Sequence, residues 1–329
     1  MNARANRGTE IAMDKQSRAL VDRLAGDPFL GPHLAPAEMR RKFGELYAEI
    51  GPTFVDVAQV QDREVTGPIG SLAVRIYHPK TDERALLPIC LFFHGGGMVV
   101  GDIESYDTLC RHLCVRSKVI IVSASYRRSP EHKYPAAVDD AYAAFEWVHA
   151  HAETFGGDPK AIAVGGESGG GYLAAVVSQL ARTRNGPKIS FQLLIYPALG
   201  TRFSSYSLRH FAVGFGFDAS GLDWIYSQYL NENAVMEDPA VSPIMASDFS
   251  NLPDAHILTA GFDILRDDAE LYGALLQHGG STVEINRVEG TIHGFVLMAG
   301  VIDKGVAAIH ECANALRRGL ATKVSDASD

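Results

Sequence analysis

One serine of this sequence, Ser168, stands among glycines between two apolar runs. Residues Gly166 to Gly170 fit the pattern G-x-S-x-G, in which a strand turns sharply into a helix and holds the serine hydroxyl at the tip of the bend. Side chains on both sides of the serine would crowd this turn, so glycines are expected there. The helix start offers unpaired N–H groups to an oxyanion. The pattern predicts a nucleophile; the alternative is a glycine-rich loop that contains a serine by chance.

A serine nucleophile needs a base, because its hydroxyl reacts poorly at neutral pH. The base is usually a histidine, and a carboxylate holds that histidine in the required tautomer. The chain has twelve histidines, of which His293 follows the last strand-like run, between Ile292 and Gly294. His293 is therefore the predicted base. The alternative is a loop histidine that binds a backbone carbonyl.

Asp263 is the predicted orienting carboxylate, because it directly follows the apolar run that begins at His256. Asp267 and Asp268 are rivals. Both lie where a helix is expected to begin, and carboxylates in a first helical turn interact favourably with the helix dipole.

An acyl-transfer reaction also requires fixed hydrogen-bond donors for the developing oxyanion. One expected donor is the N–H group of Gly169, the residue after the serine. Further donors are expected from His94-Gly-Gly-Gly97, where glycines allow the backbone to approach a substrate. The alternative interpretation of this tetrapeptide is a tight turn at the end of a strand.

These residues need a scaffold that brings distant strand ends together. Polar and apolar residues alternate at 60–66 and 71–78, which predicts antiparallel edge strands. Apolar runs predict buried strands before Gly166 and over 86–93, 119–124, 191–196, 256–260 and 282–286. Helices are expected after Ser168 and over 105–116, 138–149, 267–278 and 303–321. Strands that alternate with helices predict an α/β fold with a mostly parallel sheet covered on both faces, and such sheets carry working residues at the carboxyl ends of their strands.

The chain is expected to divide into a core and added helical parts. Residues 1–50 precede the first strand and contain an amphipathic helical pattern, with Pro36 at a helix start; they form either an outer support or part of a lid. Residues 200–238 have no strand pattern and many aromatic residues, which predicts an inserted, mostly helical cap. The core is then formed by 51–199 and 239–322, and a polar tail follows at 323–329.

Charge and composition exclude several classes of function. The net charge of −9 argues against nucleic acid or an anionic membrane surface as partner. No apolar run is long enough to span a membrane, and residues 1–18 lack the apolar segment of a signal peptide. Cys110 and Cys114, two of the four cysteines, share an apolar helix face and are expected in the core rather than in a metal or redox site. Reduced thiols and a cytoplasmic location are the resulting expectation.

Five motifs together resemble the hormone-sensitive-lipase family of bacterial esterases. In chain order they are HGGGMVVGD (94–102), YRRSPEHKYPAAVDD (126–140), GESGGGYLAA (166–175), AGFDILRDD (260–268) and GTIHGF (290–295). The resemblance extends from about residue 51 to the end of the core. It implies an α/β-hydrolase fold with a helical cap, a Ser-Asp-His triad, oxyanion donors at Gly96, Gly97 and Gly169, and neither a metal nor an organic cofactor. Members of that family are often dimers, so a homodimer is a further expectation.

The sequence departs from that family at three positions. Gly169 replaces the usual alanine, Ile264 replaces a common proline after the triad aspartate, and Arg128 adds a charge to the second motif. Arg127 and Glu131, which match the family, are expected to hold their loop by an ion pair rather than to take part in catalysis.

The resulting functional prediction is a serine carboxylesterase that forms a covalent acyl-enzyme and acts on small, short-acyl esters. The acyl chain is expected near residues that could equally belong to the core of the cap: Met98, Tyr106, Tyr196, Phe203 and Phe211. An amidase or peptidase could use the same triad, although nothing in the sequence suggests the large extra domain typical of peptidases. A binding protein on an inactive scaffold is a third alternative, which the presence of His293 disfavours.

Overall fold

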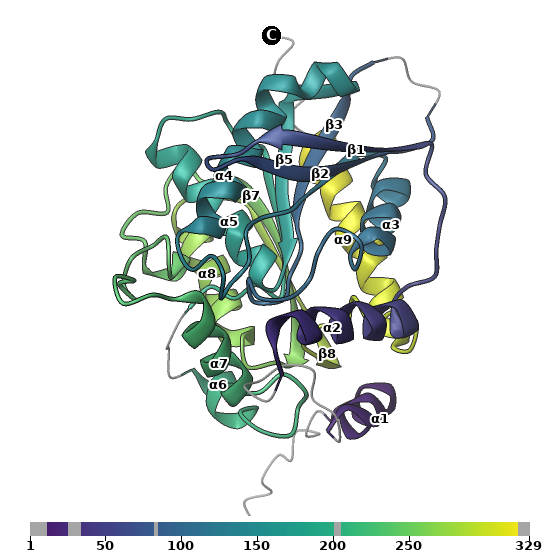
Figure 1. Cartoon of the computed structure of the whole chain (residues 1–329), viewed down its shortest axis with the longest axis vertical. Helices are drawn as coiled ribbons and strands as arrows, with labels where there is room; N and C mark the ends of the chain where they lie inside the picture. Colours follow the sequence, from purple (N-terminus) through teal and green to yellow (C-terminus); the bar gives the residue numbers. More distant parts are fainter. Residues whose placement is uncertain (1–11, 26–33, 82–84, 201–204, 322–329) are drawn as a thin grey trace, which may run out of the picture.

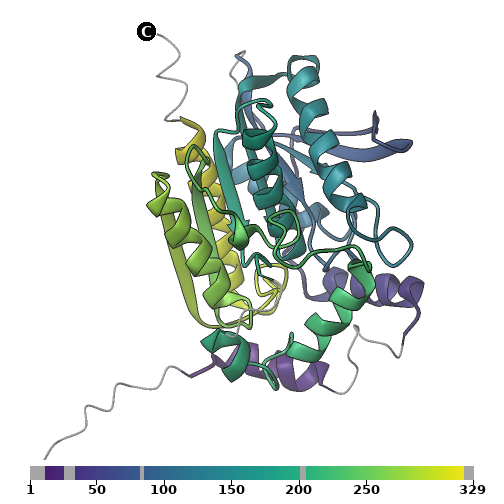
Figure 2. The same cartoon turned by 90° about the vertical axis from the view of Figure 1, so that its left-hand side faces the viewer.

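The computed structural model describes residues 12–25, 34–81, 85–200 and 205–321, and these residues form a twisted sheet with helices against both faces (Figure 1, Figure 2). The sheet has eight strands in the order β1-β2-β4-β3-β5-β6-β7-β8. They are β1 (Gln59–Thr66), β2 (Ser71–His78), β3 (Leu87–Phe93), β4 (Ile120–Ala124), β5 (Gly157–Glu167), β6 (Phe191–Ile195), β7 (Asp254–Phe262) and β8 (Val283–Ile292). The prediction of an α/β fold is confirmed.

Strands β1 and β2 form the predicted antiparallel pair, with Thr66 opposite Ser71 at the turn. Strand β2 also pairs with β4, so only β1 lies at this edge of the sheet. From β4 to β8 all neighbouring strands are parallel. The carboxyl ends of these strands therefore lie at one end of the molecule, where the candidate residues follow β3, β5, β7 and β8.

Each face of the sheet has its own hydrophobic core. Side chains alternate between the two faces along a strand; in β3, Leu91 and Phe93 belong to one core, and Cys90 and Phe92 to the other. The first core is covered by α4 (Ala136–His151), α5 (Gly169–Thr183) and α8 (Arg266–His278). The second is covered by α3 (Asp107–Ser117) and α9 (Asp303–Ala321). Figure 1 shows α3 and α9 together on one side and α4, α5 and α8 on the other.

All four cysteines are buried and free, and all belong to the core beneath α3 and α9. Burial raises the pKa of each thiol, that of Cys114 to about 12. Thiols of this kind are inert core residues. The expectation for Cys110 and Cys114 is therefore confirmed.

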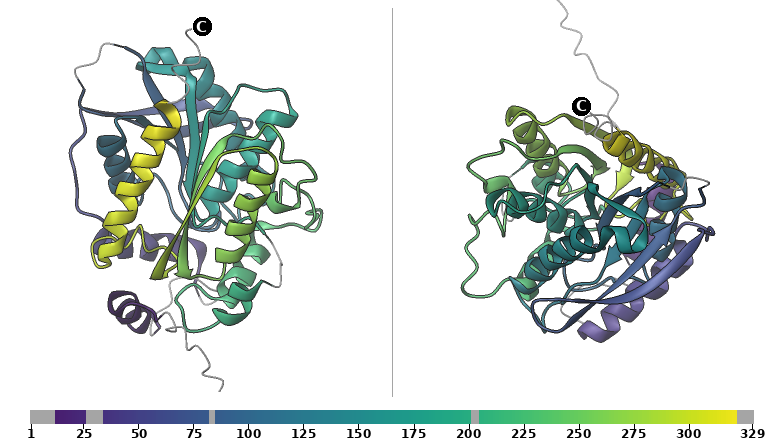
Figure 3. Two further views of the ribbon diagram at one scale, coloured as in Figure 1. Left: turned by 180° about the vertical axis from the view of Figure 1, so that it is seen from behind. Right: turned by 90° about the horizontal axis from the view of Figure 1, so that it is seen from above.

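Four further helices lie beyond the carboxyl ends of the parallel strands (Figure 1, Figure 3). They are α1 (Lys15–Leu24), α2 (Pro36–Ile50), α6 (Tyr206–His210) and α7 (Ala219–Tyr229). Helix α2 begins at Pro36 as predicted, and its buried residues contribute to the second core. Short 3₁₀ turns occur at η1 (Ala152–Phe155) and η2 (Pro243–Met245). The boundaries of core and cap at 200 and 238 stay a prediction, and the predicted tail at 323–329 lies outside the described residues.

Strand β8 is longer than the sequence pattern indicated. It runs to Ile292, and residues beyond Asn286 pair with β7. Polar residues occur in this half because β8 is an edge strand: Arg287, for example, is paired with Glu270 of α8. No helix of the described residues combines the length and the apolar character needed to cross a membrane.

Candidate active site

Ser168 lies at the sharp turn between β5 and α5. Its φ of 52° and ψ of −115° are strained for a residue with a side chain. A Cβ atom on Gly166 would lie 2.2 Å from the carbonyl carbon of Gly170, and one on Gly170 would lie 2.0 Å from the carbonyl oxygen of Phe93. These close approaches of backbone to backbone are the reason for the glycines of the motif. The turn places the serine above the end of β3.

The three predicted triad side chains meet at this turn. The His293 ring lies between the other two, with Nδ1 2.7 Å from Asp263 Oδ2 and Nε2 2.9 Å from Ser168 Oγ. The N–H group of Leu265 donates a hydrogen bond to the second oxygen of Asp263, at 2.9 Å. With a proton on Nδ1, the imidazole donates to the carboxylate and accepts from the serine hydroxyl. This arrangement can move the serine proton to Nε2.

The rival carboxylates have other partners. Asp267 accepts hydrogen bonds from the N–H group of Ser207 and from Arg266. Burial, together with the nearby Asp267 charge, raises the pKa of Asp268 to about 7. Both rivals lie in the first turn of α8, as expected for carboxylates that interact with the helix dipole. Neither forms a hydrogen bond or an ion pair with His293 in the described structure.

His293 is enclosed by aromatic rings and by negative charge. The Tyr196 ring packs edge-on against the imidazole with centroids 4.9 Å apart, and Phe217 lies at the same centroid distance. Burial alone would lower the pKa of His293. The Asp263 carboxylate and, to a smaller extent, Glu167 oppose burial, and the net pKa is raised above the ordinary value. The imidazolium form is therefore stabilised.

The glycine turn after β3 lies opposite the serine. Gly96 and Gly97 have positive φ values of 101° and 61°. Their N–H groups donate no hydrogen bond to another residue in the part of the chain described here. A Cβ atom on Gly169 would lie 3.1 Å from the nitrogen of Gly97 and 3.0 Å from Met98 Sδ. Gly169 and Gly97 thus face each other, and an alanine at 169 would be in tight contact with Met98 and with the backbone of Gly97.

Hydrogen bonds hold the carbonyl groups of this turn. Arg40 of α2 donates to the carbonyl of Val99 at 2.9 Å, and Arg128 donates to that of Gly101 at 2.6 Å. The N–H group of Ser129 donates to the carbonyl of Met98. The charge that Arg128 adds to its motif thus positions the glycine turn. The role of Arg40 was not found from the sequence, where it is one of many charges on an amphipathic helix.

The predicted ion pair between Arg127 and Glu131 is wrong. Arg127 pairs with the buried carboxylate of Asp140 on α4, at 2.7 Å. Glu131 pairs with Arg40, also at 2.7 Å, and this partner lowers the pKa of Glu131 to about 2. The two residues lie in one loop but point to different neighbours, because α4 packs on one side of the loop and α2 on the other.

The predicted acyl-binding residues differ in their environments. Met98 is nearly buried and lies beside Gly169, whereas Phe211, itself in the predicted cap segment, packs against Phe215 and Phe262. Tyr106 and Tyr196 have no exposed surface, which places them behind the catalytic residues rather than against a substrate. Phe203 lies outside the described residues. The sequence analysis did not single out Ile225 of α7, which lies over the glycine turn: a Cβ atom on Gly97 would come within 2.6 Å of its Cδ1.

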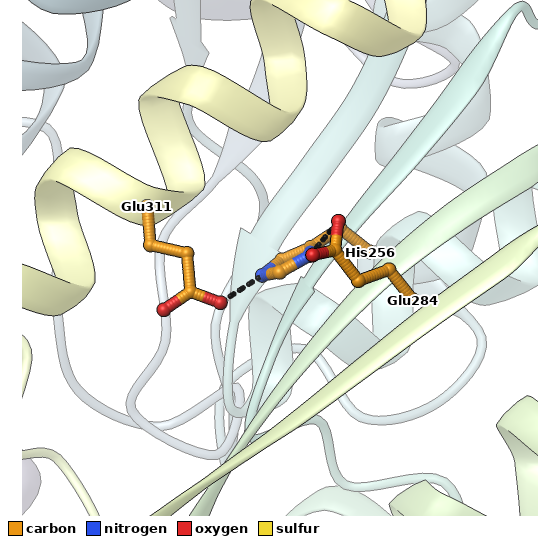
Figure 4. Close-up of side chains that lie close together, drawn as sticks. All are labelled: His256, Glu284 and Glu311. Carbon is orange, nitrogen blue, oxygen red and sulfur yellow. Dashed lines mark ion pairs between the residues drawn. The ribbon is translucent and has the colours of Figure 1, made fainter.

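A separate cluster could supply ligands to a divalent cation. Figure 4 shows His256 between two carboxylates, with Nδ1 3.4 Å from Glu284 and Nε2 3.4 Å from Glu311. Both carboxylates have other partners, since Arg318 pairs with Glu284 and Asn286 donates to Glu311. The cluster lies near the amino-terminal end of β7, away from Ser168. Its geometry fits a polar link between β7, β8 and α9.

Comparison with known proteins places this geometry among esterases. Residues 90–297 match the family described as the α/β-hydrolase fold. Esterase LipI of Mycobacterium tuberculosis is 41% identical to this chain, in an alignment that covers 79% of this chain and 82% of LipI. Carboxylic ester hydrolase LipN of the same organism is 39% identical, in an alignment that covers 79% of this chain and 70% of LipN. A solved ester hydrolase, EH1AB1 from the metagenome of Lake Arreo, is 35% identical with a TM-score of 0.89, covering 93% of this chain and 98% of its own. The hyperthermophilic esterase of the archaeon Pyrobaculum calidifontis is 34% identical with a TM-score of 0.88, covering 94% and 99%.

Proposed function

The chain belongs to the hormone-sensitive-lipase family of α/β hydrolases and is a carboxylesterase, and we propose that Ser168, His293 and Asp263 carry out its reaction. The observation that supports this assignment is the unbroken hydrogen-bonded chain from the carboxylate through the imidazole to the serine hydroxyl. The three residues also occur in the chain order known for triads on this fold.

In the first half of the proposed reaction, Ser168 Oγ attacks the carbonyl carbon of the ester. Its proton moves to His293 Nε2, and Asp263 stabilises the resulting imidazolium. The negative charge on the carbonyl oxygen is stabilised by the N–H groups of Gly96, Gly97 and Gly169. The C–O bond to the alcohol then breaks, and the alcohol leaves with the proton from Nε2.

In the second half, water hydrolyses the acyl-enzyme. His293 accepts a proton from the water molecule while the water oxygen attacks the acyl carbon. The same N–H groups stabilise the negative charge that forms on the acyl oxygen. Ser168 then leaves and recovers its proton from Nε2. No further cofactor is needed for these steps.

The proposed substrates are small esters with short acyl chains. The close cover of the site supports this class: Ser168 is only 8% exposed, Phe217 lies on the imidazole, and Ile225 of the cap touches the glycine turn. A long acyl chain would have to displace these cap residues.

A series of p-nitrophenyl esters from acetate to laurate tests the proposal, with the corresponding anilides as a measure of amidase activity. The wild type should prefer the short esters and cleave anilides far more slowly. Ser168→Ala should abolish turnover while circular dichroism stays unchanged, because a single hydroxyl forms the acyl-enzyme. Turnover retained by a folded alanine variant would refute the nucleophile assignment, and equal rates for laurate and acetate would refute the substrate class.

A cytoplasmic location and a homodimer stay predictions. Four free, buried thiols are consistent with a reducing compartment. Light scattering on the purified chain would give the oligomeric state directly.

A further inference from the structure

Glu167, the residue directly before Ser168, is a buried carboxylic acid that the triad does not use. Its side chain is 3% exposed. No lysine or arginine forms an ion pair with it in the part of the chain that the structure describes. Burial of a carboxylate without a cation is energetically unfavourable, so buried charges are normally paired and hydrogen-bonded. An unpaired acid beside the nucleophile is therefore a candidate for a role in the reaction.

Tyrosines and a glycine form the site of the Glu167 carboxyl group. Tyr106 donates a hydrogen bond to Oε2 at 2.6 Å. A Cβ atom on Gly95 would lie 1.8 Å from the same oxygen, so the first glycine of the turn after β3 makes room for this group. Burial, with a smaller contribution from the Glu167 charge, raises the pKa of Tyr47 on α2 and of Tyr196 after β6. The carboxyl group thus lies beneath the glycine turn and against the Tyr106 phenol.

The cationic group near this carboxyl group is the imidazolium form of His293, because Glu167 directly precedes Ser168, whose Oγ lies 2.9 Å from His293 Nε2. Burial raises the pKa of Glu167, and the positive form of His293 opposes that rise. In the other direction, Glu167 adds to the effect of Asp263 in raising the pKa of His293. The buried ring of Tyr196 packs edge-on against the imidazole on this side of the site.

We propose that Glu167 is a positioning residue whose carboxylate gives His293 a second negative neighbour besides Asp263, and that Tyr106 holds this carboxylate in place. The inference deepens the proposed function and rests on it. When Ser168 attacks, the proton passes from Oγ to Nε2 and the imidazole becomes positive. Glu167 accepts no proton; it stabilises that positive charge at a buried site, where charges interact more strongly than in water.

The test is the Glu167→Gln variant, which removes the charge and keeps the shape. Without this negative neighbour the imidazolium is less stable, so the acidic limb of kcat/KM should move to lower pH by roughly half a pH unit to one pH unit. At the plateau kcat should fall by about tenfold, with little change in KM. An NMR titration of the His293 ring, assigned with the His293→Asn variant, should show the same decrease in the pKa of His293 in the absence of substrate.

Three further variants separate charge from packing. Tyr106→Phe removes the hydrogen bond that favours the ionised form of Glu167. This variant should lower the pKa of His293 by a smaller amount than Glu167→Gln does. Glu167→Asp keeps a charge and should retain more of the wild-type profile than Glu167→Gln. Glu284→Gln removes a distant negative charge at the His256 cluster and should leave the acidic limb unchanged.

An unchanged His293 titration in folded Glu167→Gln would overturn the proposal. If that variant does not fold, Tyr106→Phe and Glu167→Asp decide, and an unmoved His293 titration in Tyr106→Phe has the same meaning. Full turnover by Ser168→Ala would instead refute the proposed nucleophile. The two failures are distinguishable, because the ring titration is measured without turnover.

Discussion

Asp263 differs from the neighbouring aspartates in how its two oxygens are used. One oxygen faces His293 Nδ1 and the other accepts the N–H group of Leu265, so the carboxylate is held at both ends. Asp267 uses its oxygens to bind Arg266 and the start of α6 at Ser207. The first geometry orients a base, whereas the second joins two helix starts.

We expect Asp263→Asn to lower kcat by about a thousandfold to ten-thousandfold, because the amide cannot hold the required imidazole tautomer or stabilise its positive form. Asp267→Asn should stay within a few-fold of the wild type. Steady-state kinetics with p-nitrophenyl acetate measures both variants. The reverse order of activities would transfer the orienting role to Asp267.

At the scale of elements, the side chain of Arg40 joins α2 to the proposed oxyanion turn. Arg40 donates to the carbonyl of Val99 and is held by Glu131 and the carbonyl of Ser129. The Val99 N–H group in turn donates to the carbonyl of Gly96. The docking of this N-terminal helix therefore helps to set the direction of the amides that face Ser168.

Arg40→Ala should lower kcat by roughly tenfold, with a smaller effect on KM. Without Arg40 the oxyanion donors are less well oriented, and these donors bind the transition state more strongly than the substrate. The matched control is Arg41→Ala on the same helix, because its pair with Glu45 is exposed to solvent and contributes little to stability. Kinetics and urea unfolding of both variants check the prediction. Equal kcat values in folded Arg40→Ala and Arg41→Ala would show that α2 does not position the turn.

For the molecule as a whole, the topology of the sheet concentrates function at one end. Ser168, Asp263 and His293 come from three separate parts of the chain and lie next to one another because each follows a strand of the same parallel sheet. Helices α1, α2, α6 and α7 lie beyond that end (Figure 3). The site is therefore both assembled and covered by segments that are distant in the sequence.

The pH dependence of the whole enzyme follows from His293. The imidazole must be neutral to accept the serine proton, so activity is lost as the pH falls through its pKa. Because that pKa is raised by Asp263 and Glu167, the acidic limb of kcat/KM should have its midpoint above 6.5, the ordinary value. A stopped-flow profile with a p-nitrophenyl ester between pH 5 and 9 gives the midpoint. A flat profile from pH 6 to 8 would contradict the assignment of the base.

Much of the fold and of the candidate site could be predicted from local sequence. Runs of apolar residues located the strands, and the final helix begins at Asp303 as predicted. The end of β8 was missed, because an edge strand tolerates polar residues such as Arg287. The partners of Arg127 and Glu131 were missed because charged residues of one loop can point to either side of it.

The sequence by itself determined the two glycine turns, the order of the proposed triad residues and the alternation of strands and helices. These features depend on local sterics and periodicity, which a few neighbouring residues specify. Only the tertiary structure decided that Arg40 reaches a loop 91 residues away and that Tyr106 binds a carboxyl group 61 residues away. Such contacts depend on how helices pack over strand ends, and packing is a property of surfaces that meet only after the chain has folded.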